Sequence, residues 1–93
     1  MTTDLIYEGV VIEKTPEMSF SDKNGTLHKE CTLLVETVEK YPQRLAIRLL
    51  DTECATAPSV GKNVRCYLSC RVSAGASGKW FNNIKAWRVV VVS

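Results

Sequence analysis

The chain has 93 residues, which is enough for one domain with a modest core, so a binding site is expected on the surface or in a shallow groove. Twelve Lys and Arg against ten Asp and Glu give a net charge of only +2, and so weak a field does not by itself indicate nucleic acid. The charges are unevenly distributed, because the segment after Glu53 contains six Lys and Arg and no acid. We predict a single domain over residues 1–93 with a basic C-terminal part.

The chain contains four cysteines, but its first residues carry neither the basic start nor the apolar run of a secretion signal. We therefore expect a cytoplasmic protein without membrane association, whose thiols are free and buried. On one extended strand Cys66 and Cys70 would lie roughly 13 Å apart at ~3.3 Å per residue, too far for a disulfide. Only His28 and Cys31 have a spacing of the metal-ligand type, so no metal or other cofactor is expected.

Leu5–Lys14 is the first predicted strand, and Gly9 inside it indicates a bulge or a sharp bend. A first strand that bends can belong to both sides of a small barrel. Residues 15–25 are rich in Ser, Pro and Asp and end in the pair Asn24-Gly25, which is typical of a hairpin turn. We predict a loop over these residues.

His28–Thr37 and Arg44–Leu49 alternate apolar and polar residues, as half-buried strands do. The turn between them contains Tyr41-Pro42-Gln43. We expect the apolar face of each strand in the core and the other face in solvent. The residues predicted to point inward are Cys31, Leu33, Val35, Leu45, Ile47 and Leu49.

Asp51–Gly61 is the one segment in which a helix fits, with Asp51 as its expected cap and Pro58 shortly after its end. Lys62–Val72 follows with the clearest alternation in the chain. The residues of this strand predicted to point inward are Val64, Cys66, Leu68, Cys70 and Val72.

Trp80–Val92 is the predicted closing strand, reached through a small flexible loop over residues 73–78. Its alternation is broken, so either a bulge intervenes or one of Trp80 and Trp87 faces water. Trp87 precedes a run of valines by two positions, and we expect it in the core or in a subunit contact. The aromatic and cationic residues gathered here suit bases and phosphates, but they are also common in a small β domain.

Five strands, a bent first strand and a short helical link between the third and fourth strands are the element order of an OB-fold. We therefore predict an all-β fold, a five-stranded OB-fold barrel of Greek-key topology with a short helical link between strands 3 and 4. An SH3-like small barrel is the nearest alternative, but it does not predict the helical link.

Four stretches of the chain, taken in order, resemble a known family. They are N-G-T-L-H-K-E-C-T-L-L-V-E-T (24–37), Y-P-Q (41–43), V-G-K-N-V (60–64) and W-F-N-N-I-K-A-W-R-V (80–89). The family consists of small bacterial and phage domains described as similar to single-stranded-DNA-binding proteins. The resemblance implies an OB-fold that binds single-stranded nucleic acid, as a homodimer or higher homo-oligomer. We do not expect recruitment of partners through an acidic C-terminal tail, because the sequence shows none.

OB-folds bind along the face of their second and third strands and on the loops beside it. Outward residues there are candidate contacts, since Arg and Lys pair with phosphates and aromatic rings stack on bases. The candidates are Lys23, Lys29, Thr32, Arg44, Arg48, Tyr67, Lys79 and Trp80. The alternative is an ordinary solvated face, in which Glu30 and Glu36 pair with Arg44 and Arg48 across the strands.

Arg65, Tyr67 and Arg71 point outward from the predicted fourth strand and either extend this surface or lie on the opposite side of the barrel. The only histidine, His28, has no partner pattern for a nucleophile, a metal-bound water or a phosphate loop, so we expect neither an enzyme nor catalytic residues. The sequence predicts non-enzymatic binding of single-stranded DNA, or RNA, with little sequence preference. The alternative function is a protein-interaction or assembly module that uses the valine-rich closing strand.

Overall fold

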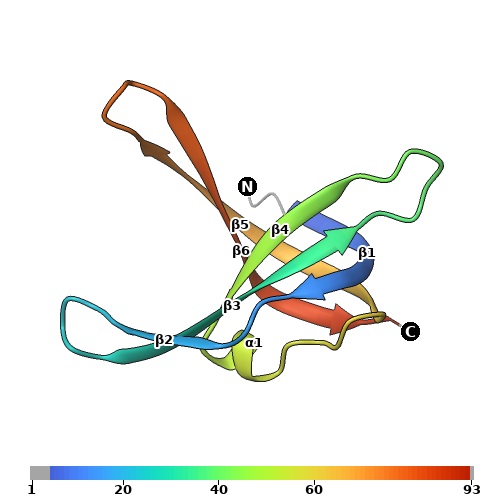
Figure 1. Cartoon of the computed structure of the whole chain (residues 1–93), viewed down its shortest axis with the longest axis horizontal. Coiled ribbons are helices and arrows are strands. Elements are labelled where there is room, and N and C mark those ends of the chain that lie inside the picture. Colours follow the sequence, from blue (N-terminus) through green and yellow to red (C-terminus); the bar gives the residue numbers. More distant parts are fainter. Residues whose placement is uncertain (1–4, 93) are drawn as a thin grey trace.

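The computed structural model describes residues 5–92, which form six strands and one short helix. In chain order these are β1 (Leu5–Lys14), β2 (Met18–Ser21), β3 (Leu27–Glu36), β4 (Arg44–Leu50), α1 (Thr52–Ala55), β5 (Asn63–Ala74) and β6 (Trp80–Val91). The strands form one sheet in the order β1-β5-β6-β4-β3-β2, and an additional pairing of β1 with β3 closes it into a barrel (Figure 1). Only the β4–β6 pair among these strands is parallel. The helical link lies after Arg44–Leu50, as predicted.

The first strand serves both sides of the barrel, as its glycine predicted. Leu5–Val10 pairs with β5, and from Val10 onward the same strand pairs with β3. A Cβ atom on Gly9 would collide with the carbonyl oxygen of Glu36. Glycine is therefore required here by the close approach of two backbones.

The core consists of the apolar faces of the alternating strands, with the helix closing one end. Ile47 and Leu49 of β4 are fully buried, and Cys54 of α1 packs against the same cluster. The buried residues are Val11, Cys31, Leu33, Val35, Ile47, Leu49, Cys54, Val64, Cys66 and Ala86. The inward faces predicted for β3 and β4 are thereby confirmed. No helix within residues 5–92 is long and apolar enough to cross a membrane.

The segment predicted as a loop over residues 15–25 contains an additional strand. Met18–Ser21 pairs with the first four residues of β3, so the two form a hairpin that projects from the barrel (Figure 1). The turn lies at Asn24-Gly25 as predicted, and the Asp22 carboxylate accepts the N–H groups of Asn24 and Thr26, both at 2.9 Å. The sequence did not predict this strand, because all four of its residues are exposed and no alternation of buried and exposed positions results.

The outer halves of β5 and β6 form a second projecting hairpin, which we call the arm (residues 69–84; Figure 1). Cys70 and Val72 were predicted to point into the core, but both are exposed. Within residues 5–92, β1 pairs with β5 as far as Leu68, and these two residues lie beyond that pairing, on the arm. The apolar and polar residues of β5 therefore keep alternating along the arm, where the core no longer covers the apolar positions.

The broken alternation of β6 has both of the predicted causes. Tyr67 pairs with Arg88 and Leu68 with Ala86, so Trp87 is the extra residue of a β-bulge. Trp80 is 79% exposed and Trp87 52%. The expected core position of Trp87 is therefore wrong, because the bulge turns its side chain outward.

Candidate nucleic-acid interface

One row of outward side chains crosses four strands of the barrel. Thr32 of β3 lies opposite Arg48 of β4, Arg48 lies beside Lys85 of β6, and Lys85 lies opposite Ser69 of β5. Directly paired residues project from the same face of a sheet. Arg48 and Lys85 are therefore neighbours although 37 positions separate them in the sequence.

This row forms the floor of a groove of about 740 Å³ between the β3–β4 face and the arm. Its lining comprises Thr32, Ala46, Arg48, Leu50, Ser69, Arg71, Val72, Ser73, Asn82, Asn83, Ile84 and Lys85. Three of these side chains are cationic, and none of the described residues in the lining is Asp or Glu. The groove thus combines positive charge, amides and hydroxyls with a few apolar side chains.

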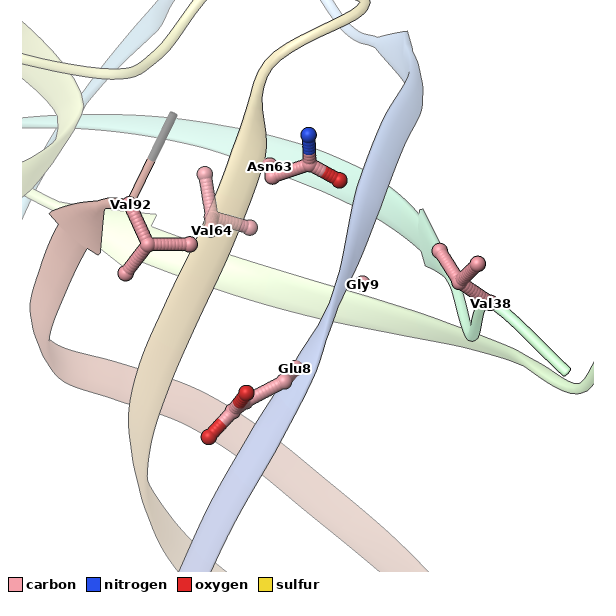
Figure 2. A pocket seen from close by; sticks show the side chains of 6 residues that line it. All are labelled: Glu8, Gly9, Val38, Asn63, Val64 and Val92. Atoms are coloured by element: carbon pink, nitrogen blue, oxygen red, sulfur yellow. The ribbon is translucent and has the colours of Figure 1, made fainter.

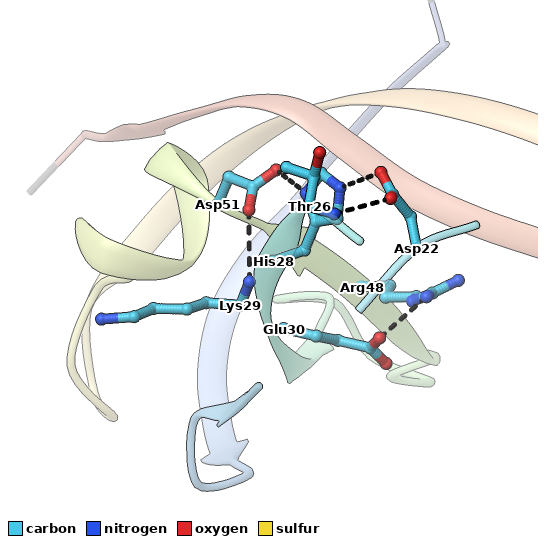
Figure 3. Close-up of polar contacts among 7 residues, drawn as sticks. All are labelled: Asp22, Thr26, His28, Lys29, Glu30, Arg48 and Asp51. Carbon is cyan, nitrogen blue, oxygen red and sulfur yellow. Dashed lines mark hydrogen bonds and ion pairs between the residues drawn. The ribbon is translucent and has the colours of Figure 1, made fainter. Parts of the chain in front are cut away.

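The three cations of the groove differ in their partners. Arg48 donates to the Glu30 carboxylate at 2.7 Å (Figure 3). Within residues 5–92, neither Arg71 nor Lys85 has a carboxylate within ion-pairing distance. Among the described residues, no carboxylate therefore has to leave these two cations for an anionic ligand to bind.

Arg44, the other favoured arginine, lies outside the groove lining. Its Nε donates to the Glu36 carboxylate at 2.8 Å, and the two residues are directly opposite in the β3–β4 register. The cross-strand pairs considered as an alternative are therefore present for both arginines. Glu30 reaches Arg48 diagonally, because Thr32 occupies the position directly opposite Arg48.

The groove contains two of the eight residues predicted as contacts, Thr32 and Arg48. Lys23 lies in the β2–β3 turn, and Lys79 in the loop of the arm. Lys29 pairs with the Glu17 carboxylate at 3.1 Å. Trp80 pairs with Ala74 and is not part of the groove lining. Alternation places Trp80 on the face of the arm opposite to that of Arg71 and Lys85.

Tyr67 is the eighth candidate, and it belongs to a cluster beside the groove. Its ring lies 5.3 Å from the Trp87 ring, centroid to centroid, and the Arg88 guanidinium is 5.5 Å from its centroid. Tyr67 is two residues before Ser69, and Trp87 is two residues after Lys85, so the cluster continues the outward face of both strands.

Arg71, Lys85 and Trp87 are the residues of this surface that sequence reasoning did not select. The sequence does not decide whether Arg71 belongs to the site, since outward residues of the predicted fourth strand could lie on either side of the barrel. The acid-free segment after Glu53 was the available signal, because all three residues belong to it. Their convergence with Arg48 depends on the parallel pairing of β4 with β6, which no local pattern predicts.

A separate polar cluster joins the β2–β3 turn to the start of α1. His28 Nε2 lies 2.8 Å from Asp22 Oδ2, and Nδ1 lies 2.9 Å from Asp51 Oδ2 (Figure 3). These hydrogen bonds raise the pKa of His28, with the bond to Asp22 as the largest cause. Asp51 was predicted to cap the helix, but its side chain makes no capping bond and instead contacts His28 and the Lys29 N–H.

A smaller hollow of about 340 Å³ lies beside Gly9 and is lined also by Glu8, Val38, Asn63, Val64 and Val92 (Figure 2). Its only charged lining residue among those described is Glu8, whose carboxylate accepts from Arg65 at 2.9 Å. Because this charged residue is acidic, the hollow would repel a phosphate. The larger groove is therefore the candidate site.

A sequence model of DUF3127, described as a domain of unknown function, matches residues 7–90. The chain belongs to this family. No curated protein matches its sequence.

Among solved structures, the DUF3127 domain is similar to the second OB-fold domain of replication protein A from Methanococcus maripaludis, with a TM-score of 0.70. The two are 17% identical, and the match covers 97% of this chain and 84% of the other. Because the identity is low, this likeness concerns the fold alone. It confirms the OB-fold, with β1, β3, β4, β5 and β6 as the five barrel strands and β2 as an addition.

Proposed function

We propose that this DUF3127 domain binds single-stranded DNA, without catalysis and with little sequence preference. The observation that carries the proposal is the convergence of Arg48, Arg71 and Lys85 from three strands in a groove whose described lining residues include no Asp or Glu. β3 and β4 are the second and third strands of the barrel, and OB-folds use this face to bind oligonucleotides. The arm corresponds to the loop between the fourth and fifth strands, which belongs to the same binding surface.

Weak sequence preference follows from the chemistry of the groove. Arg and Lys side chains contact phosphates, which carry no sequence information, and exposed rings stack on any base. A non-enzymatic role is supported by the lining, which within the described chain includes no His, Cys, Asp or Glu. The only histidine is held by two carboxylates in the separate polar cluster. The likeness to a domain of replication protein A supports the OB-fold, on which this choice of binding face depends.

Titration with oligo-dT over a series of salt concentrations tests the proposal. Binding should be strongest at low salt and weaken as salt rises, because bound phosphates release counterions. Removing Arg71 and Lys85 together in R71A/K85A should flatten the plot of log K against log salt by about 1.4, at roughly 0.7 per phosphate contact.

A matched control removes two exposed cations that lie outside the groove, in K40A/K62A. This variant loses the same charge and should keep nearly the wild-type slope. Absence of binding at low salt would refute the function. Equal losses in the two double variants would refute the groove as its site.

The alternative function, a protein-interaction or assembly module that uses the valine-rich closing strand, stays a prediction, as does the homo-oligomer. Val89–Val91 pairs with Val64–Cys66 of β5, and the Val92 N–H donates to the Asn63 carbonyl at 2.9 Å. One edge of the run is therefore already occupied within the chain. Sedimentation of the full chain tests for a homodimer or higher homo-oligomer, and a monomer at all accessible concentrations would contradict it.

A further inference from the structure

We propose that a bound strand runs lengthwise along the outward face of β5 and β6, with bases stacked on aromatic side chains at both ends of this path. The inference rests on the proposed function and specifies how the groove would be used. An OB-fold path limited to the second and third strands would instead follow β3 and β4.

The register of β5 with β6 defines the path. Ser69 lies opposite Lys85, Arg71 opposite Asn83, and Ser73 opposite Phe81. Alternate pairs of an antiparallel ribbon share one face, so these three pairs project on the same side. The hydrogen bond from Asn83 Nδ2 to Ser73 Oγ, at 2.6 Å, joins two neighbouring pairs on that side.

Tyr67 and Trp87 extend the path at the barrel end, where the bulge brings their rings to 5.3 Å. From the barrel outward, the face therefore presents an aromatic pair, then Lys85, then Arg71, and finally Phe81. Cations between two aromatic positions match a strand whose phosphates and bases must be bound together. The groove lining includes the central residues of this face, Ser69, Arg71, Asn83 and Lys85, together with Val72, Asn82 and Ile84 from alternate positions of the ribbon.

The length of the path fits a short single strand. Tyr67 and Ser73 are six positions apart, which corresponds to roughly 20 Å at ~3.3 Å per residue. Stacked nucleotides are spaced at ~3.4 Å, so about six could lie along it, within the ~4–16 nucleotides typical of an OB-fold.

The aromatic positions at both ends are accessible. Trp87 is 52% exposed and Phe81 55%. The Phe81 ring lies against Gly75 of the arm loop, where a Cβ atom would collide with it. By contrast, the sequences of β3 and β4 contain no Phe, Tyr or Trp. Base stacking is therefore assigned to β5 and β6.

Trp80 provides an internal control, because it lies on the opposite face of the same ribbon. The chain has only two tryptophans, so W80F leaves Trp87 as the single reporter and W87F leaves Trp80. On titration with oligo-dT at low salt, the emission of Trp87 should be quenched, whereas that of Trp80 should change little.

Affinities give an independent readout. W87L and F81L remove a ring but keep an apolar side chain, and each should weaken oligo-dT binding by roughly 5- to 150-fold, the range for loss of one stacked base. W80L should remain within about twofold of the wild type, since its ring is outside the path. Because these side chains are exposed, folding should be preserved, and circular dichroism checks this for each variant.

The outcomes separate this path from the function on which it rests. Wild-type binding with no quenching of Trp87 and no effect of W87L or F81L would overturn the path and leave the proposed function standing. Quenching of Trp80 together with weakening by W80L would place the strand on the opposite face and also overturn it. Absence of wild-type binding would overturn both.

Discussion

His28 bridges two segments through both of its ring nitrogens. Asp22 and Asp51 lie at 2.8 and 2.9 Å, and since ionised carboxylates only accept hydrogen bonds, both nitrogens must donate. The cluster therefore requires the imidazolium form. It links the turn of the β2–β3 hairpin to the residue before α1, while the Phe20 ring stacks on the imidazole at 5.3 Å. His28, for which the sequence shows no catalytic partner pattern, thus connects a projecting hairpin to the barrel.

We expect the stability contributed by this cluster to depend on pH. The pKa of His28 is raised, so its contribution is complete below the unfolded pKa of about 6.5 and is lost as pH rises through the folded pKa. The hydrogen bonds from His28 lower the pKa of both Asp22 and Asp51, so their contribution is complete above about 3.9 and is lost at lower pH. Stabilisation should be greatest between about pH 4 and 6.5.

NMR titration measures this directly, because the chain has a single histidine. The His28 pKa should lie above 6.5 and return toward that value in D22N/D51N. The difference in Tm between wild type and H28Q should be largest near pH 5–6 and shrink in alkaline solution. A wild-type pKa at or below 6.5 would contradict the charged bridge.

Glu30 and Glu36 allow two similar ion pairs to be compared. Arg48 lies in the groove and Arg44 outside it, yet each donates to a glutamate, at 2.7 and 2.8 Å. A phosphate that binds Arg48 must compete with Glu30. E30Q should therefore raise oligo-dT affinity roughly 1.5- to 5-fold, the range expected from an exposed ion pair.

E36Q is the matched control, since it removes the same charge from a pair outside the groove and should leave affinity nearly unchanged. Both variants are measured by titration with oligo-dT at low salt. A weaker E30Q variant would mean that Glu30 holds Arg48 in its binding position. Equal gains in both variants would indicate only a change in overall charge.

At the scale of elements, β5 shows how one strand can face two environments. Cys66 lies within the barrel and Cys70, on the same face of the strand, lies beyond it. Burial raises the pKa of Cys66 to about 11 and that of Cys31 to about 12, which suppresses their reactive thiolate forms. Alternation predicts which side a residue occupies, whereas the neighbouring strand decides whether that side is covered.

When the folded protein is treated with a thiol reagent, one cysteine should therefore react rapidly. Cys70 is exposed, whereas Cys31, Cys54 and Cys66 are buried. With a chromogenic disulfide reagent, the folded protein should show one rapid equivalent, and the denatured protein all four. The fast phase should disappear in C70S. Its persistence there would show that the arm or the barrel opens more readily than its packing indicates.

At the scale of the whole molecule, closure of the barrel depends on the passage of β1 from β5 to β3. Gly9 lies at this passage, with Glu36 of β3 against its Cα. The backbone angles of Gly9 are not in the left-handed region, so its requirement is one of space. A side chain here would separate β1 from β3 rather than disturb a turn.

G9A should destabilise the fold by at least the roughly 1–3 kcal/mol typical of overpacking, measured by urea denaturation. Amide exchange should accelerate where Val10–Lys14 pairs with β3. G78A is the control: Gly78 has open space around it but a φ of 78°, so its cost should be local to the arm loop. Normal protection of the β1–β3 pairing in G9A would contradict the role in closure.

The sequence predicted the parts of the fold that depend on local pattern. Alternation of apolar and polar residues predicted the inward faces of β3 and β4. Gly9 predicted a first strand shared by both sides of the barrel, and the segment Asp51–Gly61 predicted the helical link. It did not predict β2, whose four exposed residues have no pattern imposed by a core. For the site, it selected Thr32 and Arg48, but it also selected Trp80, which is not part of the groove lining.

By itself the sequence determined the class of fold, because burial on one side of each strand imposes a period of two that can be read residue by residue. It also placed the positive charge in the C-terminal part. Only the tertiary structure decided which cations meet, since the pairing of Arg48 with Lys85 joins strands distant in the sequence. It likewise decided that Arg44 and Arg48 are engaged by glutamates, whereas Arg71 and Lys85 have no carboxylate partner within residues 5–92. Ion pairing depends on cross-strand register, which alternation does not specify.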